Sequence, residues 1–187
     1  MPASGVADRR CAAGPIRCVT GEGLMDIEAR LSALEARVRA SEDQLEILRL
    51  LNSYGPLVDS GSGAAAADLW IAGGGYDFSG GLSGGTRIEA PRDLIAMYET
   101  EGHRGLVDTG VSHLTATPRI TLDGDAARAI GYSFVILREG ERWYIWRGAI
   151  NEWRLVRTQA GWRIAERFNR ALDGSAESHD VMRRVIG

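Results

Sequence analysis

Hydrophobic residues recur at alternating spacings of four and three along the first part of the chain. They are Ile27, Leu31, Leu34, Val38, Leu45 and Leu48, and Ser41 takes the one position where the pattern lacks an apolar residue. This spacing predicts a long amphipathic helix. The helix could pack on the sheet of its own domain or on a second subunit. A coiled-coil seam shares the spacing, although about three heptads interrupted by a serine are short for one.

Glycine and proline residues predict where this helix changes and where shorter elements follow it. Gly55-Pro56 predicts a kink in the last turn, because proline removes one backbone hydrogen bond. The helix is expected to stop near Asp59. The following segments are predicted as a short alanine-rich helix over 64–70, strands around 75–79 and 86–89, and a helix over 92–100 that opens after Pro91.

The pattern changes to long alternating segments after residue 111. Strands are predicted over 112–122, 128–138, 142–157 and 162–170, joined by short glycine-containing turns. Helices followed by an antiparallel meander predict an α+β fold in which a curved sheet wraps around the helices. Such a sheet forms a cone with one open mouth, which is a shape that binds small ligands.

Composition narrows the classes of function. The 187 residues, 44% hydrophobic and 25% charged, are typical of one globular domain. The formal net charge is -3 and the chain has no basic stripe, which argues against a nucleic-acid partner. No apolar run approaches the roughly 20 residues that span a bilayer, so we expect no membrane segment.

The ends of the chain differ from its centre. Cys11 and Cys18 both lie near the start and the rest of the chain has no cysteine, which indicates a reducing, cytoplasmic location. No further cysteine or histidine lies nearby, so no metal site is expected there. Residues 1–24 lack the apolar core of a signal peptide. We expect a disordered extension over 1–24, a domain over 25–172 and a tail over 173–187.

Histidine is scarce, and its three occurrences can be considered one by one. His179 lies in the polar tail and is expected to be solvated. His103 lies in a segment with glycines on both sides, which predicts a loop and a residue at the surface or rim. His113 begins a predicted strand and shares a semi-polar face with Thr115, Thr117, Arg119 and Thr121. That face is either the lining of a wet pocket or the outer surface of the sheet.

Asp59 stands at the expected end of the first helix. There the helix dipole disfavours a carboxylate by a few tenths to about 1 kcal/mol. The residue could be a solvated turn aspartate. Alternatively, its carboxylate could hold a histidine ring, since each charge then offsets the burial of the other.

Other side chains are candidates for the same site. Tyr54, five residues before Asp59, is either a core aromatic or a hydroxyl donor. Arg167 lies on the last predicted strand, on one face with Arg163, Ala165 and Asn169, and is either an exposed edge arginine or a source of positive charge for the site. The residues assigned to substrate binding suit a flat apolar ligand, and they are Trp70, Tyr76, Met97, Tyr132 and Trp146.

Three segments of the chain resemble the SnoaL-like branch of the nuclear transport factor 2 superfamily. They are LEILRLLNSYGPLVDSG, SHLTATPRITLDGDAARAIGYSFV and INEWRLVRTQAGWRIAERFNRAL, and the resemblance covers residues 26–172. Within the superfamily the chain is similar to dehydratases and dehydrohalogenases, such as bile acid dehydratase and hexachlorocyclohexane dehydrochlorinase, with scytalone dehydratase more distant.

The resemblance implies roles for particular residues. Those enzymes pair an aspartate near the end of the first helix with a histidine that opens a strand, which corresponds to Asp59 and His113 here. A functional tyrosine or lysine five residues before the aspartate corresponds to Tyr54, and an arginine on the last strand to Arg167. The superfamily also contains isomerases, cyclases, epoxide hydrolases, oxygenase small subunits and binding proteins, so the fold alone does not choose an activity.

The resulting hypothesis is a lyase that removes water from a cyclic or polycyclic, steroid-like or polyketide-like, substrate. His113 would be the general base, Asp59 would orient its ring, Tyr54 would hydrogen-bond an oxygen and Arg167 would supply positive charge. The chemistry needs no metal, nucleotide or other cofactor. Alternatives are a double-bond isomerase and a non-catalytic binding or oxygenase small-subunit role. We also expect a homo-oligomer, either a dimer or a trimer.

Overall fold

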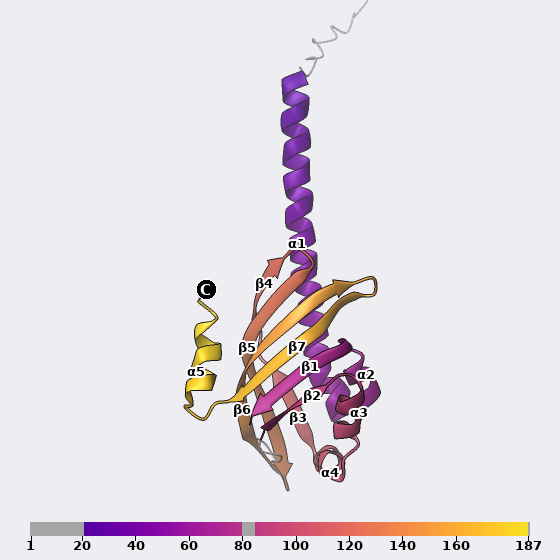
Figure 1. Ribbon diagram of the computed structural model, residues 1–187, viewed down its shortest axis with the longest axis vertical. Helices are drawn as coiled ribbons and strands as arrows, with labels where there is room; N and C mark the ends of the chain where they lie inside the picture. Colours follow the sequence, from indigo (N-terminus) through magenta and orange to yellow (C-terminus); the bar gives the residue numbers. More distant parts are fainter. Residues whose placement is uncertain (1–20, 80–84, 187) are drawn as a thin grey trace, which may run out of the picture. The chain divides into compact units, whose positions relative to one another are not determined.

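The computed structural model describes residues 21–79 and 85–186 (Figure 1). The described residues divide into two units, the first ending at Arg39 and the second beginning at Ala40. Helix α1 (Gly21–Asp59) accounts for the described part of the first unit and contributes its later turns to the second. Of the predicted disordered extension, residues 1–20 lie outside the described residues, and residues 21–24 belong to α1.

The second unit holds all the other elements. Its further helices are α2 (Gly63–Ala67), α3 (Arg92–Tyr98), α4 (Glu101–Thr109) and α5 (Ala176–Arg183). Its strands are β1 (Trp70–Ser79), β2 (Gly85–Glu89), β3 (Val111–Thr115), β4 (Arg119–Asp123), β5 (Ala126–Glu139), β6 (Arg142–Thr158) and β7 (Gly161–Ala171). Helix α5 occupies the segment predicted as a tail.

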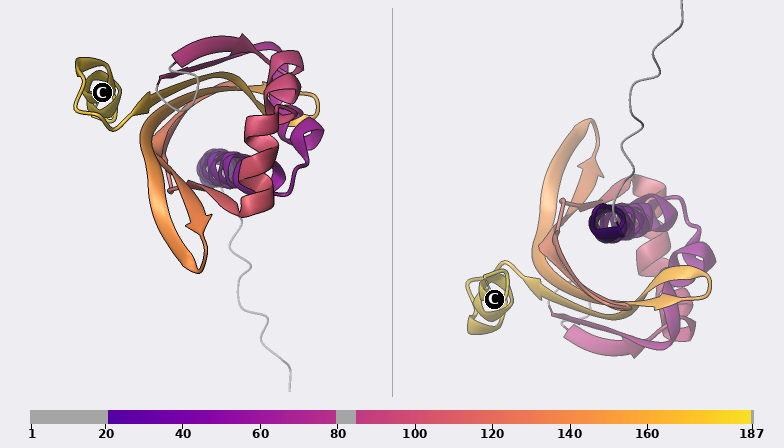
Figure 2. Two further views of the ribbon diagram at one scale, coloured as in Figure 1. Left: turned by 90° about the horizontal axis from the view of Figure 1, so that it is seen from below. Right: turned by 90° about the horizontal axis from the view of Figure 1, so that it is seen from above.

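One curved sheet organises this unit. Its strand order is β2-β1-β7-β6-β5-β3, with β4 also paired to β5, and every pair is antiparallel except β1 with β7. The sheet curves around the last turns of α1 together with α3 and α4, and it stays open on one side (Figure 2). The predicted α+β cone is therefore confirmed.

The predicted hairpin turns are also confirmed, because each has a glycine where the backbone needs a positive φ. Gly124, Gly140 and Gly161 have φ values of 58°, 60° and 92° and join β4 to β5, β5 to β6 and β6 to β7. Residues other than glycine rarely adopt these backbone angles, so each glycine marks the position of its turn in the sequence.

Several predicted elements have different bounds in the structure. The strand predicted over 112–122 is two strands, β3 and β4, because Pro118 lies between them and cannot donate to a ladder. His113 and Thr121 therefore do not share one continuous face. The alanine-rich helix ends at Ala67 instead of Trp70, which begins β1.

Helix α4 replaces the loop that was predicted around His103. The side-chain oxygen of Thr100 accepts a hydrogen bond from the His103 backbone N–H at 3.3 Å, which caps the first turn. Gly102 and Gly105, which favoured a loop in the sequence, are tolerated within this helix. The cap places His103 on a helix that faces the concave side of the sheet.

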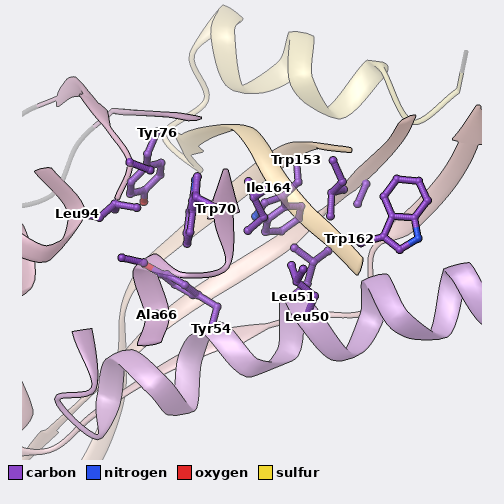
Figure 3. Packing of buried hydrophobic residues seen from close by; sticks show 14 of the residues in the cluster. Leu50, Leu51, Tyr54, Ala66, Trp70, Tyr76, Leu94, Trp153, Trp162 and Ile164 are labelled. Atoms are coloured by element: carbon purple, nitrogen blue, oxygen red, sulfur yellow. The ribbon is translucent and has the colours of Figure 1, made fainter. Parts of the chain in front are cut away.

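The core of the second unit lies between α1 and the concave face of the sheet (Figure 3). Ile47, Leu51 and Val58 of α1 are at most 2% exposed and belong to one cluster with Trp162 and Ile164 of β7. Each fully buried side chain of this size contributes roughly 1.5–3 kcal/mol of hydrophobic free energy.

A different face of α1 carries the apolar residues that recur at alternating spacings of four and three. Ile27, Leu31, Leu34, Val38 and Leu45 are between 50% and 55% exposed. In the single chain this face is exposed. The sheet instead receives the neighbouring stripe that contains Ile47 and Leu51.

Candidate functional site

A cavity of about 430 Å³ opens on the concave side of the sheet. Its lining is mostly apolar and aromatic, with side chains from α1, α3, α4 and strands β1, β3, β5, β6 and β7. This volume and composition are typical of a site for a small organic ligand. The polar groups that reach it are few, so their arrangement determines what chemistry the cavity can support.

Asp59 and His113 form a close pair at this cavity. Nδ1 of His113 lies 2.5 Å from Oδ1 of Asp59, and the backbone N–H of His113 donates to Oδ2 at 2.8 Å. The two side chains are 19% and 18% exposed. Because the carboxylate holds Nδ1, the other ring nitrogen, Nε2, remains to exchange a proton with a ligand.

The local sequence explains why helix and strand meet there. Gly55 of α1 lies against the backbone carbonyl of His113 so closely that a Cβ on Gly55 would overlap its oxygen. Asp59 follows one helical turn later, at the end of α1 as predicted. The His113 N–H and ring offset the unfavourable position of a carboxylate at a helix C-terminus. The Gly55-Pro56 step thus permits the contact, and α1 continues through Pro56.

Tyr54 also lines the cavity. Its ring contacts the His113 ring edge-on, with centroids 6.2 Å apart, and the residue is 7% exposed. The hydroxyl of Tyr98 donates to the Tyr54 hydroxyl at 3.4 Å. Burial raises the pKa of Tyr98 well above its usual range, so Tyr98 stays protonated and remains a donor near neutral pH. The two hydroxyls form a polar corner beside the histidine.

Arg167 is buried, at 4% exposure, which rules out an exposed edge arginine. Its guanidinium lies over the rings of Tyr54, Tyr76 and Trp153, 4.7 to 5.6 Å from their centroids. The predicted shared face with Arg163 and Ala165 is wrong, because the ladder between β6 and β7 shifts register between Ile164 and Glu166. This bulge turns Arg167 and Asn169 to the concave side.

A polar network beside Arg167 was not predicted. Asn151 Oδ1 accepts from Arg167 Nε at 3.0 Å and from Asn169 Nδ2 at 2.6 Å. Arg147 donates to Asn169 Oδ1 at 2.7 Å and also to the backbone carbonyl of Ser79. Arg147, Arg167 and Asn169 all line the cavity. No sequence motif marks these residues, since they come from β6 and β7 and meet only through strand pairing.

His103 lines the cavity from helix α4 and not from the predicted loop. Its ring centroid lies 6.2 Å from that of His113, and its Nε2 is buried without a hydrogen-bond partner among the described residues. Burial, and then the neighbouring His113, lower the pKa of His103. The Thr100 cap was the sequence signal that could have revealed this helix.

The structure divides the residues assigned to substrate binding. Tyr76, Met97 and Trp146 line the cavity. Trp70 does not, because it is buried behind Tyr54, with ring centroids 5.8 Å apart. Tyr132 does not either, because it is 44% exposed. Trp146 is the residue skipped between the pairs Val135–Arg147 and Ile136–Ile145, so its direction depended on a bulge that alternation cannot predict.

Across residues 21–79 and 85–186, no three histidine, cysteine, aspartate or glutamate side chains gather in a way that could hold a metal ion. Within the same part of the chain, no helix has both the length and the apolar character needed to cross a membrane.

Comparison with known proteins assigns the family. Residues 39–168 match the SnoaL-like domain, and this protein belongs to that family, within the nuclear transport factor 2-like superfamily. The superfamily includes polyketide cyclases and dehydratases. An NTF2-like protein with a cystatin-like fold from Novosphingobium aromaticivorans is 34% identical, with a TM-score of 0.76, and the match covers 81% of this chain and 96% of that one.

More distant structures share the fold. A protein of unknown function from Mycobacterium tuberculosis is 21% identical, with a TM-score of 0.62 and coverage of 82% of this chain and 90% of that one. A protein from Catenulispora acidiphila in complex with S-DNPA is 18% identical, with a TM-score of 0.56 and coverage of 68% and 91%. None of the curated proteins matches this chain.

Proposed function

We propose that this protein is a small-molecule lyase, a dehydratase that removes water from a cyclic or polycyclic hydroxyketone. The observation that carries this proposal is the Asp59–His113 pair, whose histidine lines a mostly apolar and aromatic cavity. A ring nitrogen whose partner is a carboxylate is a typical general base near neutral pH. The cavity volume of about 430 Å³ suits a substrate of several fused rings.

His113 Nε2 takes the proton from the carbon next to the substrate carbonyl. The electron pair of that C–H bond moves toward the carbonyl oxygen, which becomes an enolate. As the enolate collapses to a conjugated ketone, the bond from the β-carbon to its hydroxyl breaks. The His113 imidazolium then returns its proton to the departing hydroxide, which leaves as water and restores the neutral ring.

The neighbouring groups stabilise charge in these steps. Asp59 holds Nδ1 and stabilises the imidazolium, as carboxylates do in other histidine-based sites. The Tyr54 hydroxyl donates a hydrogen bond to the enolate oxygen or to the departing hydroxyl. Arg167 supplies positive charge from behind the Tyr54 ring, 4.8 Å from its centroid. Groups that are fixed before the reaction stabilise the transition state most effectively.

The family relationship supports a small-molecule ligand but leaves the reaction open. The Catenulispora acidiphila protein of this fold was solved with the bound compound S-DNPA, which supports use of the cavity for an organic molecule here. An isomerase would use the same proton transfer without loss of water. A binding protein would use the cavity without any proton transfer.

A screen of cyclic β-hydroxyketones tests the proposal. Dehydration produces a conjugated ketone, which raises near-ultraviolet absorbance and lowers the product mass by one water. A product of unchanged mass that depends on the enzyme would indicate an isomerase. Ligand binding without any product across the panel would contradict the lyase and favour the binding role. Asn52→Ala, an exposed position on α1, provides a matched variant that should retain full turnover.

A further inference from the structure

The arginines of the sheet differ in their partners. Arg157 pairs with Asp43 at 2.6 Å, Arg170 with Asp77 at 2.9 Å, and Arg87 with Glu166 at 2.8 Å. These pairs are typical for guanidinium groups, because a carboxylate offsets the free energy of removing the charge from water. The two arginines that line the cavity differ from these three.

Arg147 and Arg167 have only neutral partners. The contacts of Arg147 are with Asn169 and the Ser79 carbonyl, and those of Arg167 are with Asn151 and aromatic rings. Among the residues that the structure describes, no carboxylate forms an ion pair with either. The carboxylate of Asp59 is held by His113. The part of the cavity wall formed by Arg147 and Arg167 therefore carries two guanidinium groups that no carboxylate of the described residues pairs with.

Arg147 is the member of this pair that keeps an unused donor. Its Nε is buried and has no hydrogen-bond partner among the residues that the structure describes. Burial lowers the pKa of Arg147, and the charge of Arg167 acts in the same direction, although the guanidinium stays protonated near neutral pH. A guanidinium without a carboxylate partner disfavours the cavity without ligand, and an anionic ligand would offset that cost.

We propose that the ligand of this cavity carries an anionic oxygen group, a carboxylate or a phenolate, on a flat apolar frame, and that Arg147 binds this group. This inference rests on the proposed function for the identity of the cavity as the substrate site, and it adds the charge of the substrate. The aromatic lining, including Tyr76 and Trp146, takes the frame. Arg167 adds long-range attraction from behind the Tyr54 and Tyr76 rings.

Equilibrium binding of matched probes tests the charge preference. Aromatic carboxylates with one, two and three fused rings are compared with their neutral carboxamides by calorimetry on the full chain. We expect the carboxylate of the best-fitting frame to bind at least about tenfold more tightly than its amide, since a charged hydrogen bond in a buried site contributes more than 1.4 kcal/mol. A phenol probe, 7-hydroxycoumarin, completes the set. Its affinity for the protein should rise as the pH increases through the pKa of its hydroxyl group.

Substitution of Arg147 locates the preference. Arg147→Met should lower carboxylate affinity at least about tenfold and leave amide affinity unchanged, and Arg147→Lys should keep part of the preference. Arg154→Met, which changes an arginine of the same strand that pairs with Glu152, is the matched control and should bind as wild type. Far-ultraviolet circular dichroism checks that each variant is folded.

Two results would overturn the inference. One is equal or weaker binding of the anionic form in every frame size and for the phenol probe. The other is a carboxylate preference that survives in folded Arg147→Met. Because these are binding measurements, they are independent of turnover: a protein that binds carboxylates but eliminates no water would contradict the proposed function and still support the anionic ligand.

A second inference comes from α1 and does not depend on the cavity. The exposed apolar residues of α1 fall on the a and d positions of a heptad, with Leu31, Val38 and Leu45 at a and Ile27 and Leu34 at d. Such positions are usually covered by a partner helix. All five are at least half exposed in the single chain. Ser41, at one d position, weakens the seam but leaves its register intact.

The charges beside this seam select the partner and its direction. Arg30 and Arg37 occupy g positions, and Glu35 and Glu42 occupy e positions five residues later. In a parallel, in-register pair of identical helices, each g residue faces the e residue of the following heptad on the other chain, so Arg30 meets Glu35 and Arg37 meets Glu42. In an antiparallel pair g faces g and e faces e, which sets like charges together.

We infer that α1 forms a parallel two-stranded coiled coil with α1 of a second copy of this chain. The seam from residue 27 to 48 is about 33 Å long at 1.5 Å per residue. That length gives a modest interface, so the charged pairs matter for its stability. Arg30 makes one weak contact within its own helix, to Asp26 at 3.9 Å, which leaves most of its guanidinium accessible to a partner.

Charge reversal gives a specific test. One full-length chain carries Arg30→Glu and Arg37→Glu, and the other carries Glu35→Arg and Glu42→Arg. Each variant alone should self-associate at least about tenfold more weakly than wild type, because every e–g pair becomes repulsive, and the mixture should form heterodimers. Sedimentation equilibrium and pull-down of one chain by a tag on the other measure both effects.

Two further variants complete the test. Leu34→Asp should weaken association by removing a d-position contact, and Arg39→Glu, at a b position away from the seam, is the matched control that should not. Wild type and Leu34→Asp with the same mass distribution would overturn the inference. Charge-reversed chains that show no preference for each other in the mixture would also overturn it.

Discussion

Gly55 lies so close to the backbone carbonyl of His113 that only a hydrogen atom fits between α1 and β3 at that point. This contact sets the distance between the end of α1 and the start of the strand. Asp59, one turn after Gly55, then reaches both the ring and the backbone N–H of His113. The pair therefore depends on the absence of a side chain four residues away from its carboxylate.

Gly55→Ala tests that dependence. The added methyl group would overlap the His113 carbonyl oxygen, which is backbone and cannot rotate away, so α1 and β3 must separate. Alanine favours the helix by about 1 kcal/mol over glycine, and we expect the overlap to outweigh this gain and to lower the free energy of unfolding by about 1–3 kcal/mol. Thermal denaturation measures it. Ser53→Ala, on an exposed position of the same helix, is the control, and a Gly55→Ala protein as stable as this control would contradict the close contact.

Asp59→Asn separates orientation from general-base chemistry. The amide keeps the size of the side chain and an oxygen for the His113 N–H, but it does not stabilise an imidazolium. We expect kcat for water elimination to fall by about 10²-fold or more with little change in KM. A fall in kcat/KM that comes only from KM would assign Asp59 to substrate binding instead. Asp68→Asn, a change on the exposed surface, controls for net charge.

His103 gives a prediction for pH dependence. Its pKa is lowered in the folded protein by burial and by the nearby His113, with Asp59 acting in the opposite direction, and it is about 6.5 in the unfolded chain. The unfolded state therefore binds more protons than the folded state once pH falls below about 6.5. The contribution of neutral His103 to stability is complete above that pH and is lost as pH decreases toward the folded pKa.

His103→Gln removes this titration. We expect wild type to lose stability relative to the variant as pH decreases below about 6.5, and the difference between the two to be constant above it. Urea denaturation at a series of pH values measures the difference. Parallel curves for the two proteins through the acid range would show that His103 is not the titrating group.

The buried network around Asn151 should be important for stability. Asn151 is fully buried, and its Oδ1 accepts from both Arg167 and Asn169. Asn151→Leu leaves two buried donors without a partner, one of them charged, so we expect a loss of about 2–5 kcal/mol in the free energy of unfolding. Denaturant unfolding measures this loss. The exposed Asn52→Leu should change stability by less than about 0.5 kcal/mol.

Local signals in the sequence predicted the fold, whereas the Asp59–His113 pair was expected from the resemblance to the SnoaL-like family. Gly124, Gly140 and Gly161 mark the hairpins directly, and the pattern around α1 marks its length. The sequence pattern alone left His113 undecided between pocket and surface, and the resemblance to the SnoaL-like family indicated the pocket. The contact between Asp59 and His113, which the close approach at Gly55 permits, depends on where α1 and β3 cross.

Features that depend on the register of the sheet could not be predicted. The bulge at Ala165 reverses the faces of β7, so Arg167 turns inward although alternation grouped it with Arg163. The skipped Trp146 has the same effect on β6. A bulge has no sequence signature that distinguishes it from an ordinary strand residue. The polar wall of Arg147 and Asn169 was missed for this reason.

The most direct measurement of the central claim is the rate of water elimination by wild type and by His113→Gln on a cyclic hydroxyketone found in the screen. Glutamine keeps a polar side chain of similar reach but has no group that titrates near neutral pH. We predict that kcat of the variant is lower by about 10²- to 10⁴-fold, with the cavity still able to bind substrate. Turnover by folded His113→Gln within about twofold of wild type would contradict the assignment of His113 as the general base.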